Sequence, residues 1–432
     1  GGLMNYSIFS EDLNLDKEDR WQYDEKIIKT LILNLPKSFK DLQSFIYFSS
    51  KDFENDFIRP KIINILKPEI KALNYESFKS EELKKDFLTF SGNYLRLLAF
   101  NKDFKGCNSY YDKKIKDIKF EYEKIELELN MIDYKLNCLM SELQWDNAIE
   151  LYKYKANKIE KAFKNHEYSQ YEEENLNRIL FKTYNALVGA YRFISTTDQD
   201  DQIGEEYLDK AKYLVDNFFF KRNKYYYLLL SKDLIDDDIY KNNINKAEKK
   251  ITKLLEEIEN LTEEDGYPFK SGFEIQKEDL RADYFGALSQ ILVKTKRYKE
   301  AIAVNEKIIN STQNILTGDG KELNISNQFN MESFKYKAAN IDLFIIYNLL
   351  QDRKNQNKYH NIVSNFCDEK LYESVCLNYY PEKLNYAVQI RDLDLINYSY
   401  EQLKNYYSNF KSENEHINYM TETELIKQKI EI

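Results

Sequence analysis

Turn-forming residues are scarce in this chain of 432 residues. It contains 11 glycines and 5 prolines, whereas a fold of many β-strands needs a tight turn rich in such residues at each hairpin. The scarcity argues against a large β-sandwich or barrel. Aromatic residues are plentiful by contrast, with 36 Tyr and 26 Phe, and disordered chains are poor in aromatic residues. We therefore expect a folded, all-α protein.

Cysteine and histidine are also rare, with four and three residues. The cysteines lie far apart and form no C-x-x-C pair, so their spacing favours neither a disulfide framework nor a zinc site. We expect reduced thiols in helical cores and a cytoplasmic location. The histidines have no acidic or cysteine partner at metal-ligand spacing, so we expect no metal and no cofactor. The four cysteines are Cys107, Cys138, Cys367 and Cys376.

Long apolar runs and positive charge are missing as well. No segment approaches the ~18 to 20 uncharged apolar residues that a membrane span needs, so we expect no membrane partner. The first residues contain no basic segment followed by an apolar run, and we expect no secretory signal. The net charge is −10, which disfavours broad binding to nucleic acid. We expect nucleic-acid contact only through a partner complex.

Apolar residues recur at helical spacing along most of the chain. We predict helices over 16–35 and 81–99 and a loop over 101–108, which contains Gly106. These predictions place an N-terminal helical bundle at residues 4–105. The stretch 110–143 is long enough for one long helix or two nearly continuous ones.

From about residue 144, helices begin with a repeated pattern. A small residue stands at a fixed place, and bulky residues follow at later turns. A small side chain lets two antiparallel helices approach closely, and the bulky residues then fill the groove between them. The small residues are Ala148, Gly204, Ala247 and Ala301.

This pattern resembles the tetratricopeptide repeat, in which two antiparallel helices form a unit of 34 residues. Residues 283–309 fit best, although Asn305 departs from the aromatic residue of the family, and Tyr184–Tyr191 resembles a first helix. The resemblance implies a solenoid of helix hairpins at 106–410 and a capping helix at 411–432. The matching residues are Phe285, Leu288, Ser289 and Leu292 in the first helix and Tyr298, Ala301 and Ile308 in the second.

In tetratricopeptide arrays the first helices line a concave surface, where polar side chains hold a peptide. The resemblance therefore implies a non-enzymatic scaffold, adaptor or regulator that binds a protein or peptide segment. A loose likeness in layout to bacterial peptide-sensing regulators points the same way. The candidate binding residues are Lys182, Asn185 and Arg192 in one repeat and Asp283, Gln290 and Lys294 in another.

Two other functions stay open, an all-α enzyme and a nucleic-acid-associated subunit of a larger complex. The enzyme would hold Mg²⁺ in an acidic cluster, either around Asp200 and Asp201 or at 233–238. Acidic residues also favour the first turn of a helix, which explains such clusters without a metal. No G-x-S-x-G motif occurs and no base is evident for a cysteine nucleophile, so no catalytic residue is assigned.

Overall fold

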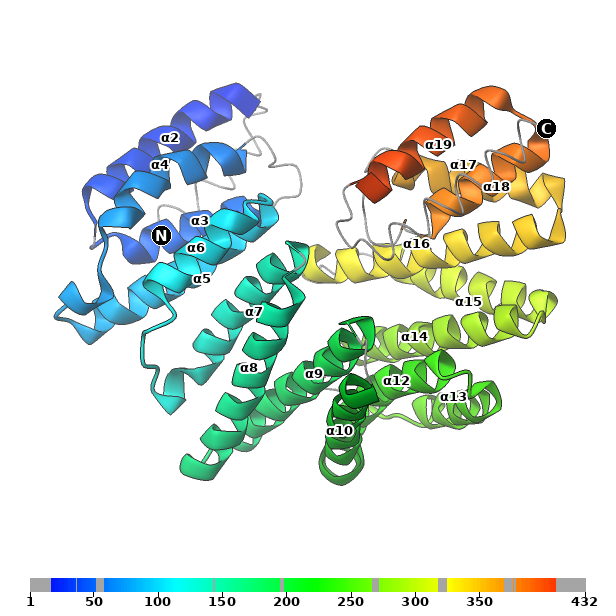
Figure 1. The fold of residues 1–432 in the computed structure, drawn as a ribbon, viewed down its shortest axis with the longest axis horizontal. Helices are drawn as coiled ribbons and strands as arrows, with labels where there is room; N and C mark the ends of the chain where they lie inside the picture. The colour runs from blue at the N-terminus through cyan, green and yellow to red at the C-terminus, as the bar shows by residue number, and fades with distance from the viewer. Residues whose placement is uncertain are drawn as a thin grey trace. The chain divides into compact units, whose positions relative to one another are not determined.

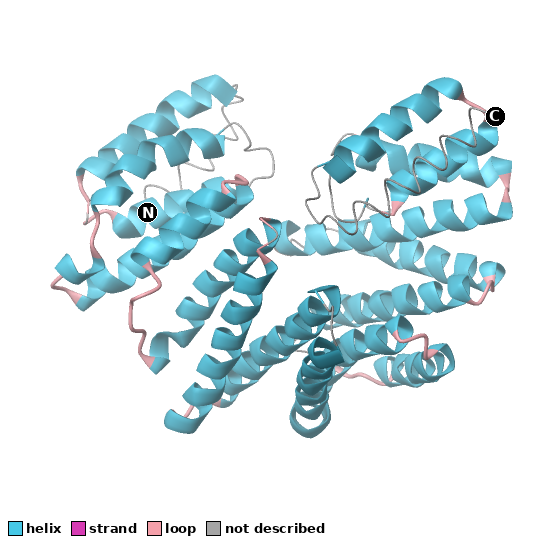
Figure 2. Cartoon of the chain, viewed as in Figure 1, coloured by secondary structure: helices cyan, strands magenta, loops and turns pink. Residues whose placement is uncertain are grey.

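The computed structural model describes residues 17–35, 37–51, 58–142, 144–194, 198–265, 272–317, 325–368, 376 and 378–408. Within these ranges every regular element is a helix and no strand occurs, which confirms the all-α class (Figure 2). The contacts group the chain into two units, 1–210 and 211–432. The predicted boundary near residue 105 stays a prediction. The predicted capping helix at 411–432 lies outside the described residues.

In the first unit each helix packs against its neighbours along the chain, with α5 at the centre of the N-terminal part (Figure 1). There α5 contacts α3, α4, α6 and α7. The helices are α2 (Lys17–Leu33), α3 (Phe39–Lys51), α4 (Ile58–Ala72), α5 (Glu81–Phe100), α6 (Phe104–Lys114), α7 (Ile125–Ser141), α8 (Trp145–Asn165), α9 (Gln170–Ile194) and α10 (Asp198–Leu214), whose last residues belong to the second unit.

The loop predicted over 101–108 is wrong, because α6 begins inside it. Asp103 is the N-cap of α6, and its carboxylate accepts a hydrogen bond of 2.9 Å from the backbone N–H of Gly106. A Cβ atom at residue 106 would collide with that carboxylate. The glycine therefore permits a tight cap where it was taken to mark a loop. Neither alternative for 110–143 is correct, because α6 ends at Lys114 and α7 begins at Ile125, with a 3₁₀ turn at Tyr122–Lys124 between them.

The second unit contains helix hairpins in sequence (Figure 1). Helix α14 packs against α12, α13, α15 and α16, and α16 packs against α14, α15, α17 and α18. Each first helix of a hairpin thus contacts the next first helix. The elements are a π-helix at Val215–Phe219, α11 (Phe220–Arg222), α12 (Lys224–Tyr240), α13 (Ile244–Glu259), α14 (Phe273–Lys294), α15 (Tyr298–Thr317), α16 (Ile325–Leu350), α17 (Arg353–Cys367), α18 (Tyr379–Ile390) and α19 (Leu393–Ser408).

The predicted small residues are buried at the helix contacts. Ala148, Ala247 and Ala301 are fully buried, and Gly204 is buried too. A Cβ atom added at Gly204 would stand 3.5 Å from the Cβ of Tyr191. Asn305, which departs from the repeat pattern, is also fully buried. Its amide donates a hydrogen bond of 2.6 Å to the hydroxyl of Ser289. A polar pair thus joins α14 to α15 where an aromatic residue was expected.

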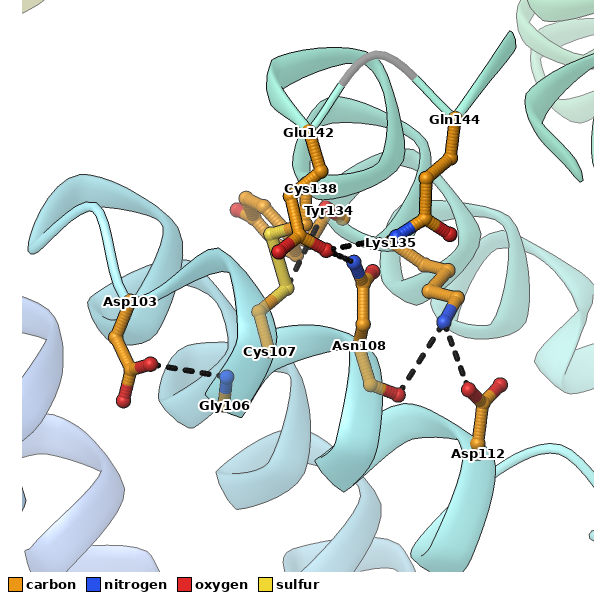
Figure 3. Close-up of a disulfide and its surroundings, with 10 residues drawn as sticks. All are labelled: Asp103, Gly106, Cys107, Asn108, Asp112, Tyr134, Lys135, Cys138, Glu142 and Gln144. Carbon is orange, nitrogen blue, oxygen red and sulfur yellow. Dashed lines mark hydrogen bonds and ion pairs between the residues drawn. A yellow bond between two sulfur atoms is a disulfide. The ribbon is translucent and has the colours of Figure 1, made fainter.

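The prediction of reduced thiols is wrong, because all four cysteines form disulfides. Cys107 is bonded to Cys138, and Cys367 is bonded to Cys376. Figure 3 shows the first bond, which joins α6 to α7. The spacing along the chain did not reveal these pairs, since residues 31 positions apart meet only when two helices pack side by side.

Candidate partner-binding face

Helices α12, α14 and α16 differ from the helices that follow them. Helix α13 buries one apolar stripe that includes Ala247, Ile251 and Leu254, and its opposite side is polar, as in a surface helix. Helix α12 has apolar residues all round, and of its residues only Tyr240 is exposed. Several charged side chains on α12, α14 and α16, among them Lys232, Asp283 and Lys335, are half-buried among neighbouring helices.

Two lysines on these helices each contact aspartates. On α12 the ammonium of Lys232 lies 2.8 Å from the carboxylate of Asp236. On α16 the ammonium of Lys335, which is mostly buried, contacts the carboxylates of both Asp279 and Asp283 on α14, the latter at 3.1 Å. It also donates a hydrogen bond of 2.8 Å to the backbone carbonyl of Asp279. We call Lys232, Asp236, Asp279, Asp283, Lys335 and Asp342 the lysine–aspartate face.

Asp283 connects the two lysines electrostatically. Burial raises the pKa of its carboxyl above the usual value, and the nearby Lys335 and Lys232 only partly oppose that effect. Burial would lower the pKa of Lys232, but the neighbouring carboxylates of Asp236 and Asp283 raise it overall. The charges of α12, α14 and α16 therefore act on one another, as expected for groups in one poorly solvated region.

Asp342 is the exception on this face. Within the described residues its carboxyl has no hydrogen-bond or ion-pair partner, and burial raises its pKa to about 7. Asp342 lies seven residues, or about 10 Å, beyond Lys335 on α16. Helix α15 runs back between α14 and α16, so these two run in the same direction. A step of seven residues along α14 leads from Asp279 to Gly286 and from Asp283 to Gln290. Gly286 has no atom within 4 Å of the place where a Cβ would stand.

The predicted binding residues on α14 have different surroundings. Asp283 belongs to the lysine–aspartate face, and Gln290 is exposed. Lys294 is exposed too, but its ammonium lies 3.4 Å from the backbone carbonyl of Ile239, where it can donate a hydrogen bond at the end of α12. Such a contact gives Lys294 a structural role, because the last carbonyls of a helix lack partners within it.

The predicted residues on α9 lie in the first unit. Lys182 is exposed and Asn185 is half-buried, on the same side of α9 as the exposed Gly189. A Cβ at Gly189 would meet no atom within 4 Å. The side chain of Arg192 lies outside the described residues. The α9 and α14 residues belong to separate units.

Sequence reasoning missed Lys232, Lys335 and Asp342. A signal for Asp342 was available, because it is the only charged residue in the apolar stretch 338–350. A charged residue inside an otherwise apolar helix is expected to have a partner or a function. Lys335 gave no such signal, since its partners lie 56 and 52 positions away in the chain.

In the acidic cluster at 233–238, which the alternative enzyme would use to hold Mg²⁺, Asp237 and Asp238 form ion pairs with lysines. Asp238 is nearly fully buried and lies 2.7 Å from both Lys246 and Lys250. Asp237 lies 3.5 Å from Lys241. In the described part of the chain, no three metal-binding side chains come together in one place. Asp238 thus joins α12 to α13, whereas Asp237 pairs with the residue that follows α12.

No protein-family model, curated protein or solved structure matches the chain. Among the helices described, none is both long enough and apolar enough to cross a bilayer.

Proposed function

We propose that this protein is a non-enzymatic scaffold or regulator whose tetratricopeptide-like hairpins bind a segment of another protein. The observation that carries the proposal is the lysine–aspartate face, where charged side chains from three successive first helices lie half-buried with one carboxyl unpartnered. The buried small residues of α8, α10, α13 and α15 support the resemblance to the repeat. The cytoplasmic location stays a prediction, and the disulfides remove the reduced thiols on which it rested.

The charge of the face favours a cationic partner. With Asp233, which acts on Lys232, this region of α12, α14 and α16 holds five aspartates against two lysines. A lysine or arginine side chain of a peptide would offset that excess, because charge complementarity guides association and suppresses wrong partners. Gly286 stands seven residues beyond Asp279, as Asp342 stands seven residues beyond Lys335, and the open space at its Cβ position leaves room for such a side chain. We therefore propose a basic peptide segment as the occupant.

The test is binding of labelled random peptides of matched length, either Lys/Arg-rich, neutral or Asp/Glu-rich, to the full chain. We expect the basic set to bind, and the double variant Asp283→Asn with Asp342→Asn to bind it about tenfold more weakly, which corresponds to about 1.4 kcal/mol. Asp216→Asn is the matched control, since Asp216 is exposed in the same unit and away from the face. Equal binding by the double variant and the control would reject the face as the site.

The residues on α9 form a separate part of the proposal. The double variant Asn185→Ala with Arg192→Ala tests whether the first unit also contacts the peptide. A loss of affinity that adds to the loss from Asp283→Asn would show two independent contributions. Unchanged affinity would discard the α9 residues and leave the lysine–aspartate face as the candidate.

A further inference from the structure

The C-terminal helices hold a lysine that is almost completely buried. Lys383 on α18 is 1% exposed. Its ammonium lies 2.8 Å from both carboxylate oxygens of Asp368 and 3.0 Å from the amide oxygen of Gln402. The rings of Tyr398 and Tyr379 lie 4.5 Å and 5.7 Å from the same nitrogen. Asp368 is thus the acid that neutralises a charge placed among aromatic residues.

Asp368 stands directly beside a disulfide. It follows Cys367, the last residue of α17, and its backbone N–H caps that helix by bonding to the carbonyl of Ser364. Cys367 is bonded to Cys376, which precedes α18 by three residues, and both cysteines are fully buried. The hydroxyl of Tyr380 donates a hydrogen bond of 3.2 Å to the carbonyl of Cys367. The disulfide therefore fixes the end of α17, and with it the carboxylate, against α18.

The disulfide of the first unit lies in different surroundings. Cys107 and Cys138 both stand within helices, α6 and α7. The nearby Lys135 also pairs with an acid, Asp112, at 3.0 Å (Figure 3). Asp112 lies inside α6, so the helix itself holds it in place. Asp368 lies past the end of its helix, as the C-cap, and directly follows a cysteine of the disulfide.

We propose that the Cys367–Cys376 disulfide is a redox-sensitive latch, which keeps Asp368 paired with the buried Lys383 and releases the packing of α17–α19 when it is reduced. Breaking a buried ion pair by removing one partner is strongly destabilising, because the remaining charge is uncompensated. Loss of the carboxylate would also leave Lys383 beside His360, whose pKa burial and Lys383 already lower. The helices α18 and α19 would then open to hydrate the ammonium.

The reaction needs a dithiol reductant, such as dithiothreitol or a dithiol protein of the same chemistry. One of its thiolates attacks one protein sulfur, forms a mixed disulfide and expels the other cysteine as a thiolate. Its second thiol then displaces the first cysteine and closes the reductant's own disulfide. The protein gains two electrons and two protons as two thiols, and the reductant loses the same number. In an oxidising compartment the latch stays closed.

The test uses the full chain and measures amide hydrogen exchange region by region, with and without dithiothreitol. The chain with Cys107→Ser and Cys138→Ser retains only the latch. We expect reduction to speed exchange at 379–408 at least tenfold in it. The variant Cys367→Ser with Cys376→Ser should exchange fast in this region with or without reductant. Wild-type protein, followed separately at 104–141 and 379–408, gives the same answer if either double variant fails to fold.

The variant Lys383→Met distinguishes a disulfide that acts through the Asp368–Lys383 ion pair from one that only cross-links α17 and the segment before α18. Methionine fills a similar volume without charge, so reduction leaves no uncompensated buried charge in this variant. Reduction should therefore speed exchange at 379–408 at most threefold. An equal response with lysine and with methionine would overturn the coupling between the disulfide and the ion pair. Unchanged exchange at 379–408 after mass spectrometry has confirmed reduction would overturn the latch itself.

Discussion

Both units bury a lysine beside a disulfide, but they neutralise its charge in different ways. Each contains one disulfide and, beside it, a lysine that is almost fully buried and paired with an aspartate. In the first unit the aspartate, Asp112, is 52% exposed, and Lys135 also donates a hydrogen bond of 3.2 Å to the carbonyl of Asn108. In the second unit Asp368 is only 23% exposed.

The difference shows what makes a buried charge sensitive to its surroundings. Lys135 keeps a backbone carbonyl as a second partner, and water reaches its carboxylate. Lys383 depends on one carboxylate, an amide oxygen and aromatic rings. The energetic cost of losing the acid should therefore be larger in the second unit, because the remaining ammonium is less solvated.

Removing the disulfides gives the largest expected effects. If each acts only by closing a loop, the loss of the 31-residue link at Cys107–Cys138 should lower the free energy of unfolding by about 3.7 kcal/mol. Loss of the 9-residue link at Cys367–Cys376 should lower it by about 2.6 kcal/mol. Urea unfolding of the two Cys→Ser double variants measures both. The loop-closure calculation predicts the smaller loss of stability at Cys367–Cys376. If removing that disulfide instead lowers the free energy of unfolding more than removing Cys107–Cys138, the result favours the latch.

Neutralising the two aspartates compares the ion pairs directly. Asp368→Asn should destabilise the second unit by about 3 kcal/mol, because it leaves Lys383 buried without an acid. Asp112→Asn should cost the first unit about 1 kcal/mol or less, because Asp112 is half-exposed and salt and water screen it. Hydrogen exchange resolved by unit checks both values. Equal costs would show that burial of the acid does not distinguish the two lysines.

Acid should weaken the second unit through His360. Its ring packs against Tyr386, with centroids 4.7 Å apart, and its Nε2 atom has no hydrogen-bond partner among the residues that the structure describes. Burial and Lys383 lower its pKa, although Asp368 opposes them. As the pH falls, His360 is therefore protonated in the unfolded chain before it is protonated in the folded chain. Stability should fall as the pH drops below about 6.5, by at most about 1.4 kcal/mol per pH unit from this group. His360→Phe should flatten the profile, and an unchanged slope would exclude His360 as its cause.

The smallest expected effect concerns Asp342. Because burial raises its pKa to about 7, the folded chain holds a proton there that the unfolded chain has lost. Wild-type stability should therefore fall as the pH rises from about 4 through 7. Asp342→Asn should gain about 1 kcal/mol at pH 8, because the carboxyl is partly exposed and solvent reduces the effect, and nothing at pH 4. Asp216→Asn, at an exposed position of the same unit, is the control and should change little at either pH. Thermal unfolding at pH 4 and pH 8 measures the difference, and an equal gain at both pH values would contradict the assignment.

The helices were largely predictable, whereas the site was not. The helices predicted over 16–35 and 81–99 correspond to α2 and α5. Helical periodicity is a local property and can be read from a few turns. Asp283 was predicted as a binding residue because of the repeat, and the structure gives it a different neighbourhood, between Lys232 and Lys335. Those contacts join residues about 50 positions apart, which no local pattern reports.

The chain by itself determined that the protein is helical, because its apolar residues follow the helical period and its turn residues are too few for strands. It also determined which small residues are buried between helices. Only the tertiary structure decided that the cysteines pair, that Lys383 meets Asp368, and that Asp342 has no partner among the described residues. These outcomes depend on which helices pack side by side, and packing joins positions that the sequence keeps apart.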